Sequence, residues 1–303
     1  MEEKFEEKLR NCLDKGTVLK DEMMKKHITF RVGGPADYFV VPKTVKEVCD
    51  VVNLCRNDNI PYYIIGNGSN LLVGDKGYRG VVIQMFKELS TLEVNENRIK
   101  AQAGCRLSQI ANEALKAGLG GFEFAAGIPG TLGGAVIMNA GAYGGEMKDV
   151  LDNVTVLTKD GKVEILKKEE LGLGYRRSRI ADDGDIVLEA EIVLREKEQD
   201  EIKAVMDDLR ERRVSKQPLE YPSAGSTFKR PEGYFAGKLI QDAGLRGFSV
   251  GGAQVSEKHC GFVINKGEAT AEDIIHLIHS VTEKVKEDTG ITLEPEVKCL
   301  GEF

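Results

Sequence analysis

Residues with apolar side chains recur at helical spacing in several stretches of this chain. Thr44 and Glu47 stand three positions apart at the start of one stretch, which predicts a helix that begins with a capping box. The apolar positions that follow, from Val48 to Cys55, fall on one face of that helix. A short apolar run at 61–65 comes next and predicts a buried strand. The pattern therefore alternates between helix and strand from an early point.

Similar patterns continue toward the C-terminus. The run Val154–Leu166 predicts a hairpin, and its Asp160-Gly161 pair is typical of a two-residue type I′ turn. Because helices and strands mix throughout, we expect an α+β fold. The further apolar patterns predict helices at 107–115, 237–240 and 271–288 and strands at 80–83, 186–194, 261–265 and 291–300.

A charged segment at 196–218 interrupts this sequence of elements. It predicts a helix with Ile202, Val205, Met206 and Leu209 on one side, and Pro218 ends it. The change in composition at this helix is typical of a junction between domains. We therefore expect a separate C-terminal part beyond it.

Composition and charge exclude several classes of protein. The chain has 303 residues, of which 30% are charged and 41% hydrophobic, as in an ordinary soluble globular protein. A net charge of -7 argues against general nucleic-acid binding, which needs a basic face. No apolar run is long enough to span a membrane, and the N-terminal stretch lacks the pattern of a signal peptide. The six cysteines are scattered, so we expect reduced thiols and a cytoplasmic protein.

Two glycine-rich stretches indicate a ligand that approaches the backbone. Gly66-Asn67-Gly68-Ser69-Asn70 follows the apolar strand at 61–65, where a phosphate-binding loop is expected. It is not the dinucleotide fingerprint of the Rossmann fold, because the third glycine is missing. Taken alone, such a loop is more often a plain turn. The second stretch, 127–145, also carries little side-chain volume, and the two together favour a nucleotide-containing cofactor without deciding which one.

Three polar segments are candidates for chemistry. The run 174–179 holds three arginines, which are either a solvated basic patch or a site for a carboxylate. Glu294 and Glu296 flank Pro295, and they are either surface acids or groups that move protons. The segment 221–231, "YPSAGSTFKRP", places a hydroxyl on a glycine turn beside two cations.

The histidines give weaker signals. His276 and His279 have the i,i+3 spacing of a metal pair, but no further ligand pattern accompanies them, so we interpret them as ordinary helix residues. The neighbours His259 and Cys260 directly precede the strand predicted at 261–265, and adjacent residues on a strand face opposite ways, which favours strand packing over a thiolate–imidazole pair.

Eight segments in order resemble one family. They are "TFRVGGPAD", "IIGNGSNLLV", "GIPGTLGGAVIMNAGAYG", "GYRRSR", "AGSTFKRP", "AGKLIQDAGLRG", "VGGAQVSEKHCGFVIN" and "LEPEV". From about Thr29 to Gly301 the chain resembles the UDP-N-acetylenolpyruvoylglucosamine reductases (the MurB family), flavoenzymes of peptidoglycan precursor synthesis.

The resemblance implies an FAD-binding part of the vanillyl-alcohol oxidase/p-cresol methylhydroxylase type and a smaller α+β substrate domain. The implied bounds are 1–85 and 86–200 for two FAD-binding subdomains and 201–303 for the C-terminal domain. Noncovalent FAD, NADPH as hydride donor, UDP-N-acetylglucosamine enolpyruvate as substrate and a monomeric state are also implied. Only 50 residues separate Arg176 from Ser226 (226 − 176), so the chain resembles the shorter subgroup, which lacks an extra tyrosine-bearing loop.

The resemblance also assigns residues. The family's catalytic arginine, proton-donating serine and catalytic glutamate fall on Arg176, Ser226 and Glu296, and Tyr175, Lys229 and Arg230 are expected to bind substrate. The expected FAD contacts are Gly66, Asn67, Gly68, Ser69, Asn70, Gly127, Ile128, Pro129, Gly130, Thr131, Gly133, Gly134, Asn139, Gly141 and Ala142.

Two other functions fit parts of this pattern. One is a flavoenzyme of the same scaffold that oxidises an alcohol or amine with oxygen as acceptor. The other is a UDP-sugar-binding protein that has lost catalysis. The Arg176, Ser226 and Glu296 set favours the reductase over both.

Overall fold

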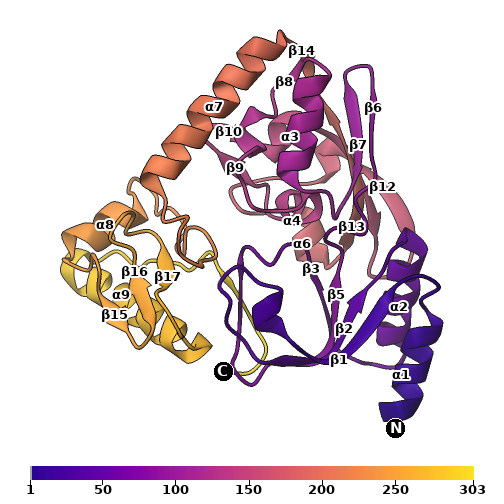
Figure 1. The fold of residues 1–303 in the computed structure, drawn as a ribbon, viewed down its shortest axis with the longest axis horizontal. Coiled ribbons are helices and arrows are strands. Elements are labelled where there is room, and N and C mark those ends of the chain that lie inside the picture. Colours follow the sequence, from indigo (N-terminus) through magenta and orange to yellow (C-terminus); the bar gives the residue numbers. More distant parts are fainter. Residues whose placement is uncertain (1) are drawn as a thin grey trace. The chain divides into compact units, whose positions relative to one another are not determined.

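A computed structural model describes residues 2–303 of the chain (Figure 1). These residues form two compact units. Unit 1 comprises residues 2–19, 39–67 and 81–212, and unit 2 comprises residues 20–38, 68–80 and 213–303. Residues 20–38 and 68–80 therefore group with the C-terminal part of the chain, and the domain bounds expected from the sequence stay a prediction. Among the described residues, no helix is both long and apolar enough to cross a bilayer.

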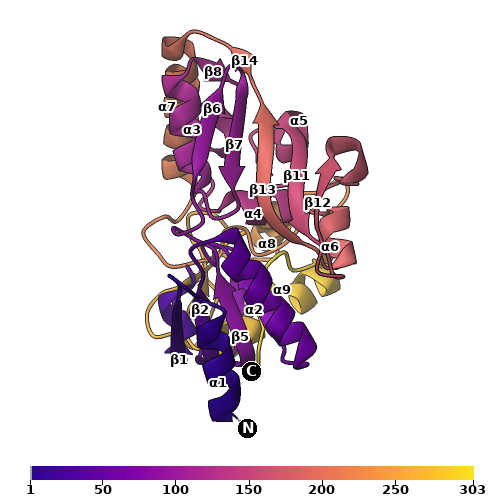
Figure 2. The same cartoon turned by 90° about the vertical axis from the view of Figure 1, so that its right-hand side faces the viewer.

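The largest sheet of unit 1 has five strands in the order β12-β11-β13-β7-β6, with neighbours antiparallel (Figure 2). In β13 the apolar residues alternate with Glu189 and Glu191, so Leu188, Ala190 and Ile192 are buried on one face. Helices α3 and α4 pack against strands of this sheet. The bounds are β6 Leu92–Asn95, β7 Arg98–Gln102, β11 Leu151–Leu157, β12 Val163–Lys167, β13 Ile186–Val193, α3 Leu107–Lys116 and α4 Leu132–Ile137.

The hairpin between β11 and β12 is confirmed, but its turn differs from the prediction. Leu157 pairs with Val163, so five residues connect the strands. The N–H of Gly161 donates to the carbonyl of Thr158 at 2.9 Å, and Gly161 alone among these loop residues has a positive φ, of +82°. A type I′ turn needs positive φ at both central residues, so the prediction of a two-residue type I′ turn at Asp160-Gly161 is wrong.

Helix α2 (Val45–Asn57) buries the face that the pattern predicts, and half of its capping box forms. The hydroxyl of Thr44 accepts from the N–H of Glu47, at 3.1 Å. The Glu47 carboxylate does not return to Thr44. It is buried and accepts from the N–H groups of Lys43, Lys15 and Gly16 at 2.6, 2.7 and 3.3 Å. Glu47 therefore joins the start of α2 to the loop after α1 (Glu2–Asn11).

The remaining elements are short. A four-stranded sheet has the order β1-β2-β5-β3, in which β3 and β5 are parallel. The bounds are β1 Thr17–Met23, β2 Pro35–Val41, β3 Tyr62–Ile65, β5 Tyr78–Gln84, β8 Leu119–Gly120, β9 Gly141–Ala142, β10 Gly145–Glu146, β14 Arg195–Glu196, α5 Met147–Val150, α6 Arg179–Asp183, and the 3-10 turns Met24–Lys26, Glu123–Ala125 and Lys168–Glu170.

Unit 2 contains a small sheet covered by one long helix. Strands β15 (Ser249–Val250), β16 (Ala253–Val255) and β17 (Val263–Asn265) pair in that order, and α9 (Ala271–Thr289) packs against them. Helix α9 starts at a Thr270/Asp273 capping box and ends at Gly290, close to the predicted 271–288.

The predicted strand at 291–300 is shorter in the structure. Only β18 (Lys298–Leu300) forms, parallel to β4 (Leu71–Val73), and Pro295 makes an isolated bridge to Phe228. The short helix predicted at 237–240 is α8 (Ala236–Asp242).

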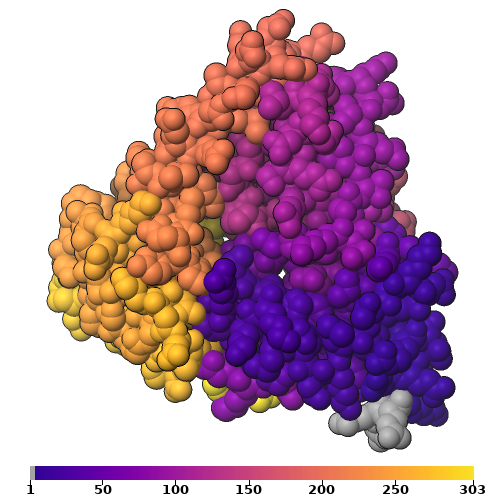
Figure 3. All heavy atoms as spheres, viewed as in Figure 1, coloured from indigo at the N-terminus to yellow at the C-terminus, as the bar shows by residue number. Residues whose placement is uncertain are grey.

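The charged helix is α7 (Gln199–Lys216), and its apolar side is not a buried face. Only Ile202 is buried, and Val205 is 38% exposed. Figure 3 shows the orange atoms of α7 open to solvent along the helix. Ion pairs at i,i+4, such as Lys203–Asp207 at 2.6 Å, each add a small stabilisation to this exposed helix.

We predict that Glu47→Gln lowers the free energy of unfolding by about 1–3 kcal/mol at pH 7, because three backbone donors lose a charged acceptor. Burial by itself raises the pKa of this carboxyl, but the donors from Lys43, Lys15 and Gly16 hold its pKa below its usual range. Ionised Glu47 therefore contributes stability above the unfolded pKa, and the contribution is lost as the pH falls through the lower folded pKa.

Thermal denaturation of both proteins across pH 3–7 measures this effect, where ~4.3 is the usual pKa of a glutamate. The exposed residue Glu164 gives the matched control, Glu164→Gln. A difference between wild type and Glu47→Gln that stays constant down to the acid limit would contradict the assignment.

Candidate functional site

The two glycine-rich stretches meet within unit 1. A Cβ at Gly66 would lie 2.1 Å from Oγ1 of Thr131, so glycine at this position lets the buried threonine approach the loop. The side-chain amide of Asn67 donates to the carbonyl of Pro129 at 2.7 Å. The strand-to-loop corner at Gly66-Asn67 and the segment 129–131 thus form one wall.

That wall lines a cavity of about 360 Å³. Four of the expected cofactor contacts belong to it, namely Asn67, Ile128, Pro129 and Gly130. The other lining residues are Phe86, Lys87, Arg106 and Ser108, which the sequence analysis missed. They carry no local motif, and only the fold places them beside the glycine-rich loops.

Two glycines of the second stretch pack closely inside the protein, and their expected contact with FAD stays a prediction. A Cβ at Gly133 would lie 2.9 Å from that of Ala103, and a Cβ at Gly141 would lie 2.6 Å from the carbonyl oxygen of Gly145. Internal packing therefore explains these two positions, while Ala142 lies beside Gly141 in β9. Gly134 is exposed on the short helix α4, and the nearest atom to its missing Cβ is 3.8 Å away. Its open backbone is available to a ligand.

The expected catalytic arginine stands at the tip of a tight turn. Gly174 and Arg177 exchange backbone hydrogen bonds of 3.0 and 3.2 Å, and Arg176 between them has a φ of +56°. A non-glycine residue in this region is uncommon and strained. Its guanidinium carbon lies 5.1 Å from the ring centroid of Tyr175, which is 52% exposed.

The side chain of Asn139 holds this turn in place through hydrogen bonds. Its side chain is buried, and Nδ2 donates to the carbonyl of Gly174 at 3.0 Å and to Oε2 of Glu146 at 2.8 Å. Its Oδ1 accepts from the N–H of Lys148 at 2.9 Å. The amide is thus used in holding the arginine turn against β10 and α5, and its expected contact with a cofactor stays a prediction.

Charges balance around the same turn. The hydrogen bond from the Lys148 ammonium holds the pKa of Glu146 below its usual range, and the Asn139 amide and the nearby Arg176 charge act in the same direction against burial. The Glu146–Lys148 pair joins the two side chains at 2.8 Å. Glu146 is therefore an anion that faces the arginine.

In unit 2 the serine and glutamate segments run beside each other. The N–H of Glu296 donates to the carbonyl of Thr227 at 2.8 Å, and the N–H of Lys229 donates to the carbonyl of Glu294 at 2.8 Å. This antiparallel contact brings Ser226, next to Thr227, to the strand-like segment that carries Glu296. Ser226 itself is exposed, whereas Thr227 is buried.

Thr227 fixes the position of the serine. Its N–H donates to the carbonyl of Gly261 at 2.8 Å, and its Oγ1 accepts from the N–H of Val263 at 2.9 Å. On the other side of Ser226, Gly225 has a φ of +75° with nothing within 4 Å of its missing Cβ. Backbone conformation, and not close approach, therefore requires glycine at 225.

The second half of the first glycine loop belongs to this unit. Gly68 packs against Ile28, where a Cβ would lie 2.8 Å from the Ile28 Cα. Asn70 donates from Nδ2 to the carbonyl of Glu296 at 3.2 Å and accepts from the N–H of Lys298 at 3.0 Å. Ser69 lies between these two fixed residues, so the loop and the glutamate segment are held together.

The two expected substrate cations are both engaged. Lys229 forms an ion pair with Glu294, and the guanidinium carbon of Arg230 lies 4.0 Å from the ring centroid of Phe235. Phe235 is 61% exposed. The structure thus places Ser226, Glu296, Lys229 and Arg230 in unit 2, and Tyr175 and Arg176 in unit 1.

The histidines do not add to the site. His276 and His279 are exposed on α9. His259 and Cys260 lie in a turn and not in a strand, since the N–H of Phe262 donates to the carbonyl of His259 at 3.0 Å. The expectation of strand packing is wrong for this pair. Burial lowers the pKa of His259, whose Nδ1 accepts from the N–H of Gly261 at 3.1 Å.

Comparison with known proteins first defines the class. Residues 36–167 match a family model described as "FAD binding domain", so the chain is a flavin-dependent oxidoreductase with an FAD-binding part. Residues 217–300 match the model "UDP-N-acetylenolpyruvoylglucosamine reductase, C-terminal domain". The expected α+β class, with an FAD-binding part and a smaller C-terminal domain, is confirmed.

Full-length relatives then give the family. The chain is 55% identical to the UDP-N-acetylenolpyruvoylglucosamine reductase of Agathobacter rectalis over 100% of both chains. It is 54% identical to that of Clostridioides difficile over 97% of both. The crystal structure of the reductase from Thermus caldophilus covers 94% of this chain and 99% of its own, with 37% identity and a TM-score of 0.80. The chain belongs to the UDP-N-acetylenolpyruvoylglucosamine reductase family.

The residues around the cavity fit FAD. Asn67 and the segment 128–130 line it without a bulky side chain beyond Ile128, and Gly134 leaves backbone open nearby in the chain. Lys87 and Arg106 add positive charge at its wall. Such a combination suits a ligand with a diphosphate and flat rings.

We predict that Gly66→Ala destabilises the protein by about 1–3 kcal/mol, because the new methyl group overlaps the Thr131 hydroxyl. Thr131→Ala removes Oγ1, after which the nearest remaining atom, the Cβ at residue 131, lies 3.2 Å away. The double variant should therefore be more stable than the sum of the single effects, by about 0.5 kcal/mol or more. Urea unfolding of the four proteins measures the coupling, and strict additivity would show that the two side chains do not meet.

We predict that Asn139→Asp lowers the stability by about 2 kcal/mol or more at pH 8, because a buried carboxylate would face Glu146 and the carbonyl of Gly174. Aspartate tolerates the left-handed φ of +43° at this position, so the backbone adds no new strain. The deficit should shrink as the pH falls and the new carboxyl is protonated. Melting temperatures at pH 8 and 5.5 test this, with the exposed substitution Asn95→Asp as control. Equal melting temperatures for the two variants would argue against the anchor.

Proposed function

We propose that this protein reduces the enolpyruvyl ether of UDP-N-acetylglucosamine enolpyruvate to UDP-N-acetylmuramate, with NADPH as the electron source, in peptidoglycan precursor synthesis. The full-length similarity to reductases of this name supports the substrate. The observation that carries the residue assignment is the backbone pairing at 227 and 296, which holds the proposed acid and the proposed glutamate on adjoining segments.

Bound FAD would supply hydride transfer from NADPH to the terminal vinyl carbon of the substrate. Residues that hold it would be Gly66–Asn70, Gly127–Thr131, Gly133, Gly134, Asn139, Gly141 and Ala142, through backbone and short polar groups. Of these, Asn67, Ile128, Pro129 and Gly130 have the support of a shared cavity.

The protein's own side chains would stabilise the developing negative charge and donate the final proton. After hydride addition, negative charge builds on the adjacent carbon and its carboxylate. Arg176, with Glu296 in hydrogen-bond support, would stabilise that charge, and preorganised groups of this kind contribute ~3 kcal/mol each. The strained turn that holds Arg176 favours this role, since strain concentrates at functional positions.

Ser226 would give the final proton to the carbanionic carbon. A hydroxyl suffices for this step, because the carbon is basic enough to take a proton from a weak acid. The structure supports the assignment in two ways. Ser226 is exposed, and the residues on both sides of it, Gly225 and Thr227, fix the backbone that presents it.

Tyr175, Lys229 and Arg230 would bind the substrate. Lys229, which is paired with Glu294, would either bind the UDP diphosphate or ease formation of an alkoxide at Ser226. Arg230 on the exposed ring of Phe235 provides a cation beside an aromatic surface.

We predict that Ser226→Ala keeps reduction of the flavin by NADPH but slows its reoxidation by the enolpyruvyl substrate by at least ~100-fold, since a positioned acid contributes 10²–10⁴. Stopped-flow absorbance of the purified holoenzyme under anaerobic conditions separates the two half-reactions. Ser249→Ala, an exposed serine of β15, is the matched control.

Arg176→Ala and Glu296→Gln should likewise spare the NADPH half-reaction. Turnover of Ser226→Ala at the wild-type rate would remove Ser226 as the acid. Slow reduction by NADPH in the Arg176 or Glu296 variant would assign that residue to the other half-reaction. Oxygen consumption with alcohols, and no reaction with the enolpyruvyl substrate, would favour an oxidase instead.

A further inference from the structure

One hydroxyl in unit 2 joins two segments that lie far apart in the sequence. Oγ1 of Thr29 donates to the carbonyl of Ser223 at 2.6 Å, across 194 residues. The same oxygen lies 3.5 Å from the carbonyl of Gly68, which is too long to compete for its single proton. The backbone N–H of Thr29 donates to that carbonyl instead, at 3.2 Å. Thr29 therefore connects the first glycine loop to the serine segment, residues 223–227.

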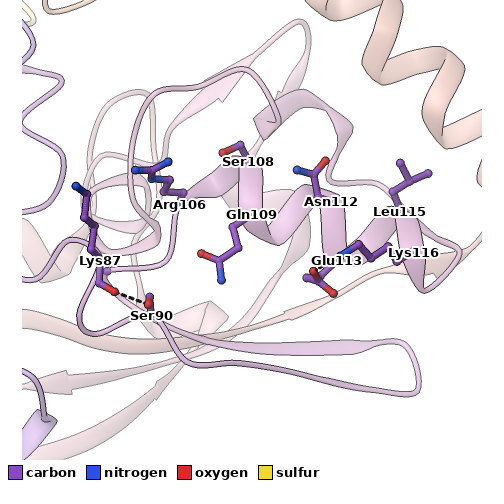
Figure 4. Close-up of a pocket in the computed structure, with 10 residues that line it drawn as sticks. Lys87, Ser90, Arg106, Ser108, Gln109, Asn112, Glu113, Leu115 and Lys116 are labelled. Carbon is purple, nitrogen blue, oxygen red and sulfur yellow. Dashed lines mark hydrogen bonds and ion pairs between the residues drawn. The ribbon is translucent and has the colours of Figure 1, made fainter.

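Two other hydroxyl-to-carbonyl bonds show what such a bond does locally. Thr282 donates at 2.9 Å to the carbonyl four residues earlier in α9. Ser90 donates at 2.5 Å to the carbonyl of Lys87, three residues earlier, at the wall of a cavity of about 600 Å³ in unit 1 (Figure 4). Both bonds satisfy polar groups within one helix or turn. The bond from Thr29 to Ser223 is different, because it sets the distance between two separate parts of the chain.

The Thr29 bond reaches the serine segment just before the turn that presents Ser226. Gly225 in that turn has a φ of +75° and open space around its missing Cβ. Hydrogen bonds on both sides of the turn hold the segment. Downstream, the N–H of Thr227 donates to the carbonyl of Gly261 at 2.8 Å, and upstream the Thr29 hydroxyl holds residue 223. Because Ser226 is exposed, loss of the upstream bond would let its hydroxyl move.

These hydrogen bonds form a closed circuit of three segments in unit 2. Thr29 joins the serine segment to the glycine loop at Gly68. Two residues further along that loop, Asn70 donates to the carbonyl of Glu296 at 3.2 Å. The N–H of Glu296 then donates to the carbonyl of Thr227 in the serine segment at 2.8 Å. The glycine loop, the glutamate segment and the serine segment are thus held at fixed distances from one another.

We propose that Thr29 is a positioning residue for proton transfer from Ser226, because its hydroxyl holds the serine segment in register with the glycine loop. This inference rests on the proposed function, in which Ser226 is the acid and residues 66–70 hold FAD. Proton transfer needs the hydroxyl within hydrogen-bond reach of the carbon that takes the proton, and a displacement of ~1 Å can slow such a step by ~10²-fold. Thr29 acts through the backbone at Ser223 and not on the reacting atoms.

Thr29→Val tests the proposal, because it removes the hydroxyl and keeps both the branched shape and the N–H that donates to Gly68. Anaerobic stopped-flow absorbance of the holoenzyme should show reoxidation of the flavin by the enolpyruvyl substrate slowed by about tenfold or more. Reduction by NADPH and the Kd for FAD should stay at the wild-type values. Thr29→Ser keeps the hydroxyl and should reoxidise at close to the wild-type rate. Thr29→Ala provides a second loss of the hydroxyl, without a methyl group against the Ser223 carbonyl.

A double variant separates positioning from a general loss of structure. If Thr29 acts through Ser226, Thr29→Val should add nothing to the effect of Ser226→Ala, and the two proteins should reoxidise their flavin at the same rate. A merely structural role would multiply the two losses. Thr282→Val is the matched control, because it makes the same change at a hydroxyl that donates to a carbonyl within α9. This control should reoxidise at the wild-type rate.

Four outcomes overturn the inference and leave the proposed function in place, provided that Ser226→Ala is slow. They are wild-type reoxidation in Thr29→Val and Thr29→Ala, equal slowing of both half-reactions, no rescue by Thr29→Ser, and multiplied losses in the double variant. Wild-type reoxidation in Ser226→Ala would instead overturn the proposed role of that serine, and the inference with it.

Discussion

The antiparallel contact between residues 227–229 and 294–296 is the interaction on which the candidate chemistry depends. Two backbone hydrogen bonds of 2.8 Å join the segments, and Asn70 adds a third contact through the carbonyl of Glu296. Because these bonds use the main chain, they fix the spacing of Ser226 and Glu296 whatever the side chains do. If the hydroxyl and the carboxylate lay on separate flexible loops, both loops would have to be ordered at each turnover, at a cost in conformational entropy.

In unit 1, hydrogen bonds fix the position of the Arg176 turn in a comparable way. The buried amide of Asn139 joins three backbone or side-chain groups, and one of them is the carbonyl that begins the Arg176 turn. A buried amide whose donors and acceptor all have partners is rigid. Breaking any of these hydrogen bonds would leave a polar group buried without a partner, which is costly. The Asn139 side chain, together with the two backbone hydrogen bonds between Gly174 and Arg177, thus maintains the strained conformation of Arg176.

Glycine serves several physical purposes in this chain. At Gly66 and Gly133 the missing Cβ makes room for another part of the protein, and at Gly225 the left-handed backbone requires it. Gly134 alone among these four has open space and no positive φ. Dense glycine therefore indicates a ligand only at some of its positions, and the packing around each residue decides which.

The sequence by itself determined the family, the α+β class, the buried face of α2 and the extent of α9, and it named the candidate members of the site, whose roles stay predictions. Local periodicity, capping residues and motif order are sufficient for these, because they depend on neighbours along the chain. Tertiary structure decided the five-residue hairpin loop, the exposed side of α7, the partners of Glu47 and the place of Phe86, Lys87 and Arg106. These depend on contacts between residues far apart in sequence, whose energies no local pattern contains.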